Sequence, residues 1–85
     1  MTYKDVKDFL HIAENAYNVG AYYESAMIVQ RMAYLIAGGP RSNGFTPAEN
    51  RKLTELVKKA INRFTDCPDE CAWEDTCGLI DLFRP

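Results

Sequence analysis

The sequence predicts an all-α protein, a small bundle of three to four helices whose first two helices form an antiparallel hairpin. Apolar residues recur at intervals of three and four along most of the first 65 residues, as on one face of a helix. Glycine-containing breaks divide this pattern into segments of ordinary helical length. Because no pair of alternating apolar segments joined by a hairpin turn is present, no β-sheet is expected.

The chain is expected to form one domain over residues 1–85. Its 85 residues are 47% apolar and 26% charged, with five glycines and four prolines, so neither a disordered chain nor a fibre is expected. We expect the helical core within residues 2–65. An acidic, cysteine-containing C-terminal segment follows over residues 66–85.

The first predicted helix begins after Thr2 and ends before Gly20. Thr2 is a favourable N-cap, and Asp5 three residues later can complete a capping box. Gly20 can adopt the left-handed conformation that ends many helices, and the next helix follows closely, which favours an antiparallel hairpin. The residues expected on the buried face of this helix are Val6, Phe9, Leu10, Ala13, Ala16 and Tyr17.

The second predicted helix, residues 21–37, is apolar on almost every side. Only Glu24 and Arg31 form a polar strip. The apolar positions are Tyr22, Ala26, Met27, Ile28, Val29, Met32, Ala33, Leu35 and Ile36. A helix of this kind is either central in its fold or part of an interface. We therefore expect it to pack on the other helices and to present its remaining apolar side to a partner.

The third predicted helix runs over residues 47–65. The sequence Gly38-Gly39-Pro40 ends the preceding helix, and residues 41–45 are expected to form a loop. Thr46, Pro47 and Glu49 then form a strong helix start, with a capping residue, a proline at the first helical position and a capping-box partner. The predicted core positions are Leu53, Leu56, Val57, Ala60, Ile61 and Phe64.

Tyrosine and methionine on the second helix indicate an interaction surface. Tyr22 is expected to face the first helix, whereas Tyr23 and Tyr34, together with Met27, lie on another side. Tyrosine and methionine are enriched in protein interfaces because they offer a large contact area with a polar or adaptable tip. We therefore expect a small protein–protein interaction module, acting as an adaptor, regulator or inhibitor. Its partner would be another protein or a second copy of the chain in a homo-oligomer.

Charge is distributed unevenly along the chain. Residues 1–65 contain nine Lys/Arg against six Asp/Glu, whereas residues 66–85 contain one arginine against six acids. The acids Glu70, Glu74 and Asp75 therefore form a second candidate surface, for a basic partner protein. The small size of the chain is typical of accessory proteins of phages and mobile elements.

Nucleic-acid binding is the alternative function. The residues that carry it are Arg51, Lys52, Lys58, Lys59 and Arg63, all on the predicted non-core side of the helix at residues 47–65. The sequence pI of about 5.3 and the presence of Glu55 on the same side favour a solvated face instead.

Three cysteines are the only residues whose spacing resembles a ligand set. Cys67, Cys71 and Cys77 could hold a structural zinc ion with a fourth ligand, but they lack the Cys-x2-Cys spacing of typical zinc sites. Free buried thiols are the favoured interpretation and a disulfide is a third, so no cofactor is expected. His11, the one histidine, is expected to point toward water. No catalytic motif is present, and we expect that the protein is not an enzyme.

The N-terminal residues lack the basic start and apolar core of a secretory signal. The longest apolar-rich stretch, residues 26–37, is shorter than the roughly 20 residues that span a bilayer. We therefore expect a cytoplasmic protein with no membrane partner.

Overall fold

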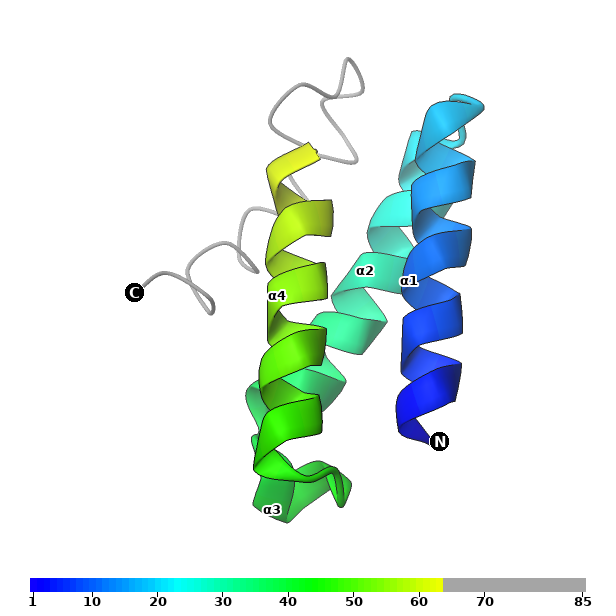
Figure 1. The fold of residues 1–85 in the computed structure, drawn as a ribbon. Coiled ribbons are helices and arrows are strands. Elements are labelled where there is room, and N and C mark those ends of the chain that lie inside the picture. Colours follow the sequence, from blue (N-terminus) through cyan, green and yellow to red (C-terminus); the bar gives the residue numbers. More distant parts are fainter. Residues whose placement is uncertain (64–85) are drawn as a thin grey trace.

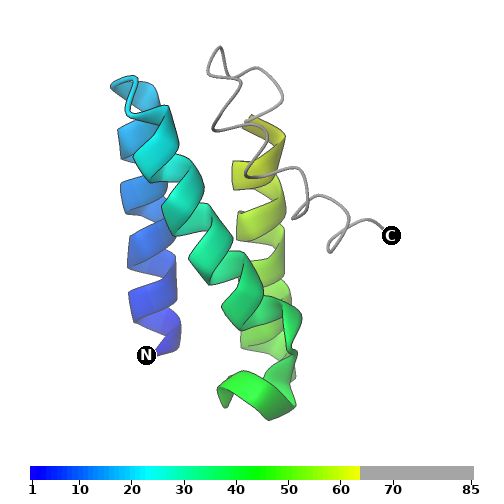
Figure 2. The same cartoon turned by 180° about the vertical axis from the view of Figure 1, so that it is seen from behind.

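The computed structural model describes residues 1–63 and confirms the all-α bundle. Its helices are α1 (Tyr3–Asn18), α2 (Tyr22–Ala37), the short α3 (Pro40–Asn43) and α4 (Pro47–Arg63). Helices α1 and α4 run side by side in the same direction, and α2 runs in the opposite direction across one side of both (Figures 1 and 2). The acidic, cysteine-containing segment predicted over residues 66–85 lies outside the described residues.

The N-terminus of α1 has the predicted capping box. The Thr2 hydroxyl accepts a hydrogen bond from the Asp5 amide at 3.2 Å, and the Asp5 carboxylate accepts one from the Thr2 amide at 3.0 Å. The hydrogen bond from the Thr2 amide to the Asp5 carboxylate lowers the pKa of Asp5, and the Thr2 hydroxyl lowers it further. Because the folded pKa is depressed, the contribution of this box to stability is present above the unfolded pKa and is lost as the pH falls through the folded value.

The predicted antiparallel hairpin of α1 and α2 is confirmed. Gly20 has φ of +87°, a left-handed conformation that ends α1 and reverses the chain. Ser25, which is buried in α2, donates a hydrogen bond of 2.6 Å to the backbone carbonyl of Ala13 in α1. The rings of Tyr17 and Tyr22 meet edge to face with centroids 5.1 Å apart, so Tyr22 faces α1 as expected.

The expectation of a plain loop over residues 41–45 is wrong, because Pro40–Asn43 form the short helix α3. A proline at the first position of a helix begins the helix at no cost, since its missing N–H would have no partner there. Gly39 and Gly44 flank this turn, each with φ of +79°. The same proline that ends α2 therefore starts α3.

Asn43 joins α2, α3 and α4. Its side-chain amide donates to the Leu35 carbonyl at 3.2 Å and to the Asn50 Oδ1 at 2.8 Å, and its Oδ1 accepts from the Phe45 amide at 3.0 Å. The Phe45 side chain, which the sequence placed in the loop, is buried. The residues between α2 and α4 therefore form an ordered, packed connection.

The core lies where the three long helices meet. Its members are Val6, Leu10, Ala13, Ala26, Val29, Met32, Ala33, Ile36, Phe45, Leu53, Val57 and Ile61. Phe9, predicted in the core, is instead 39% exposed. The face of α1 that touches its neighbours is centred on Val6, Leu10 and Ala13, and Phe9 lies at its edge. Ser25 is the buried polar side chain among the described residues, and its hydroxyl is paired.

The start of α4 gives a testable stability effect. The Thr46 hydroxyl accepts from the Glu49 amide at 3.1 Å, and the Glu49 carboxylate accepts from the Thr46 amide at 3.0 Å. Thr46→Ala is expected to lower the free energy of unfolding by about 1 kcal/mol, because the Glu49 amide loses its acceptor. Urea denaturation followed by circular dichroism measures this change. Thr54→Ala is the control, because the Thr54 hydroxyl only bonds back to the Asn50 carbonyl of its own helix; equal losses would contradict the capping role.

Candidate functional site

The exposed side of α2 carries a line of large apolar side chains. Tyr23, Met27 and Tyr34 are 48%, 40% and 61% exposed. Their spacing of four and seven residues places them one above another on the same side of the helix. We call these three residues the α2 stripe. The opposite side of α2 provides the buried residues Ser25, Ala26, Val29, Met32, Ala33 and Ile36.

The α2 stripe can form both apolar and polar contacts. Helix α2 lies in front of α1 and α4 in Figure 2, so its outer side is not covered by either of these helices. Among the described residues, the hydroxyls of Tyr23 and Tyr34 form no hydrogen bond, and Glu24 and Arg31 beside the stripe form no ion pair. The stripe is therefore an apolar surface with unused polar groups at its border.

A second line of exposed apolar residues lies along α1 and its C-cap, where the sequence did not predict it. Phe9, Ile12 and Val19 are exposed and follow one another at helical spacing. Their positions lie on the side of α1 away from Glu14, which faces α4. The spacing of three and seven residues is visible in the sequence, but the sequence pattern predicts Phe9 in the core.

The five basic residues of α4 do not form one continuous face. Positions 51 and 58 lie on one line along the helix, and positions 52, 59 and 63 lie on another. Glu55 lies between these lines, and the Lys58 amine is 3.9 Å from its carboxylate. Of the five, Arg51, Lys52 and Lys59 are exposed, whereas Lys58 and Arg63 are half-buried. The interruption by Glu55 and the partial burial of Lys58 and Arg63 make this helix less suited to nucleic-acid binding than the sequence predicts.

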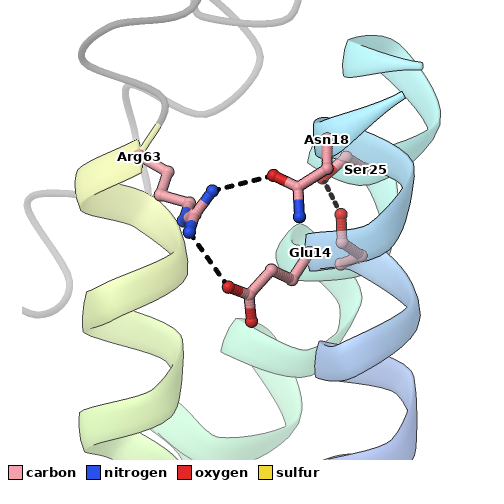
Figure 3. Close-up of polar contacts among 5 residues, drawn as sticks. Glu14, Asn18, Ser25 and Arg63 are labelled. Atoms are coloured by element: carbon pink, nitrogen blue, oxygen red, sulfur yellow. Dashed lines mark hydrogen bonds and ion pairs between the residues drawn. The ribbon is translucent and has the colours of Figure 1, made fainter. Parts of the chain in front are cut away.

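Arg63 forms a bridge from the end of α4 to the end of α1 (Figure 3). Its guanidinium donates to the Asn18 Oδ1 at 2.9 Å and lies 3.1 Å from the Glu14 carboxylate. It also lies over the Tyr17 ring, 5.8 Å from the ring centroid. These contacts hold α1 and α4 together, so the guanidinium of Arg63 is already engaged within the protein.

A small cavity of about 80 Å³ lies between α1 and α4, with Ser25 and Val29 of α2 also in its lining. It is lined largely by apolar side chains such as Leu10 and Leu56, and the polar groups around it include His11 and Lys59. Cavities that accept a ring as small as benzene measure about 150 Å³. This space therefore does not define a site for a larger small-molecule ligand.

The remaining predicted site residues lie outside the described residues. These are Cys67, Cys71 and Cys77 of the candidate metal set, and Glu70, Glu74 and Asp75 of the acidic surface. Within residues 1–63, no group of three His, Cys, Asp or Glu side chains could hold a metal ion. His11 is exposed, as expected.

Comparison of the chain with protein-family models, with curated proteins and with solved structures gives no match. In the described part of the chain, every helix is too short or too polar to cross a membrane.

Proposed function

We propose that this protein is a small interaction module that binds another protein or a second copy of itself through the α2 stripe. The exposure of Tyr23, Met27 and Tyr34 in one line on the central helix carries this proposal. The small size of the module suits an adaptor, regulator or inhibitor that acts in the cytoplasm. It also suits an accessory protein of a phage or mobile element.

The energetics define what a partner must provide. Full burial of one large apolar side chain contributes about 1.5–3 kcal/mol, and the α2 stripe already buries roughly half of its surface. The stripe can therefore add roughly 2–4 kcal/mol, whereas association costs about 4 kcal/mol or more in lost freedom. A stable complex must therefore include the border of the stripe, where Glu24 and Arg31 are exposed.

Site-specific photo-crosslinking in the host cell tests the proposal. A photoreactive phenylalanine analogue at Tyr34 is expected to give a covalent adduct of defined mass, with another protein or with a second copy. The same analogue at Lys4, which is exposed on α1, is the control and is expected to give none. Adding Met27→Lys should abolish the Tyr34 adduct, because a charge then interrupts the stripe. Adducts of equal yield at both positions, or none at either, would contradict an interaction through α2.

A further inference from the structure

The exposed side of α2 has a symmetrical order of side chains. Tyr23 and Glu24 lie near its start, Met27 near its middle, and Arg31 and Tyr34 near its end. An acid thus precedes the centre and a base follows it, on the same flank of the stripe, while the two tyrosines lie toward the other flank. Such a surface is nearly complementary to itself when one copy is reversed.

This arrangement identifies an occupant for the α2 stripe, and the identification rests on the function proposed above. We propose that a second copy of the chain binds the α2 stripe through its own α2 stripe. The two α2 helices run antiparallel and are related by a twofold axis near Met27. A twofold axis brings the same patch of both copies together. In an antiparallel pair, like flanks meet in reversed order. Glu24 of each copy therefore meets Arg31 of the other, and Tyr23 meets Tyr34.

Charge selects this orientation. Glu24 and Arg31 are the only charged residues of α2, both are exposed, and neither has an ion-pair partner among the described residues. A parallel twofold pairing would instead place the charged flank of each copy against the tyrosine flank of the other, so neither Glu24 nor Arg31 would meet an opposite charge. Opposite charges across an interface set orientation and register more than they set affinity. The two apolar stripes and their charged borders together stabilise the dimer, and the two ion pairs fix its direction.

Sedimentation velocity of the full chain, over a concentration series at low salt, tests this dimer. A reducing agent must be present, because the three cysteines could otherwise link two copies covalently. We expect a weak, reversible dimer with Kd on the order of 100 µM, since the contact is small. Met27→Lys should remove the dimer, because it places two ammonium groups at the axis.

A charge exchange then tests the antiparallel pairing. Glu24→Arg alone and Arg31→Glu alone are each expected to weaken the dimer by at least about fivefold, because each places like charges in contact. The double variant, Glu24→Arg with Arg31→Glu, is expected to recover an affinity within about threefold of the original. Asp8→Arg, a charge reversal at an exposed position of α1, is the matched control and should leave the Kd unchanged.

Each result decides between distinct claims. A chain that remains monomeric at about 1 mM, while Tyr34 still crosslinks to another protein in the cell, overturns the second copy and leaves the proposed function standing. A monomer without any Tyr34 adduct overturns both. If the single charge reversals leave the Kd of the dimer unchanged, the antiparallel pairing is overturned. It is also overturned if the double variant does not recover the original Kd. Circular dichroism of each variant shows that the fold is retained.

Discussion

Leu53→Ala is expected to lower the free energy of unfolding by about 2–5 kcal/mol. Leu53 is completely buried in the face of α4 that packs into the core, between the capped start of this helix and Val57. Removing its three outer carbons loses their burial and leaves a cavity that the surrounding helices can fill only in part. Urea denaturation of the full chain, followed by circular dichroism, measures the loss.

Leu56→Ala is the matched control for this prediction. Leu56 lies on the same apolar side of α4 but is half-buried, at the border that faces α1. The same deletion there should cost less than at Leu53, because fewer neighbours surround the side chain. A neutral result at Leu53, or a larger loss at Leu56, would show that the core of the bundle is misplaced.

Asn43→Ala is expected to cost about 1–3 kcal/mol. The substitution removes three hydrogen bonds at once and leaves the Leu35 carbonyl and the Phe45 amide without their partners. Both groups lie close to the packed connection between α2 and α4, where water replaces the lost amide poorly. Thermal or urea unfolding measures the effect.

Two further variants test the role of Asn43. Ser42→Ala changes the neighbouring exposed residue and should alter stability by less than about 0.5 kcal/mol. Asn43→Asp keeps the acceptor for the Phe45 amide but cannot donate to the Leu35 carbonyl, so it should not restore the stability of the original chain. A neutral Asn43→Ala would show that the side chain does not hold this connection.

The helix starts and the first turn could be predicted because they depend on neighbouring residues. A threonine followed three residues later by an acid is a local pattern, and it forms a capping box at Thr2 and at Thr46. The turn at Gly20 is equally local, since it requires only a residue that tolerates a positive φ.

The connection between α2 and α4 could not be predicted in the same way. The role of Asn43 depends on Leu35, eight residues before it, and on Asn50, seven residues after it. No periodic pattern reveals such bonds, because they exist only once the helices are in place. The burial of Phe45 also depends on this tertiary arrangement.

The candidate site was predicted in part. Helical periodicity alone places Tyr23, Met27 and Tyr34 on one side of α2, and the structure finds that side exposed. The periodicity of α1 could not show which edge of its wide apolar face would stay outside, so Phe9 was misassigned. The sequence pattern places Arg63 among five surface cations. Its hydrogen bond to Asn18 could not be predicted, because Asn18 is 45 residues away.

The bridge made by Arg63 also bears on the order in which the bundle assembles. The hydrogen bond between Ser25 and Ala13 spans 12 residues, whereas the one between Arg63 and Asn18 spans 45. Closing a loop costs about 0.6 kcal/mol more for each doubling of its length, so the second contact costs about 1 kcal/mol more in chain entropy. We therefore expect α1 and α2 to pair early in folding. Helix α4 is expected to pack against α1 last, when Arg63 at its end reaches Asn18.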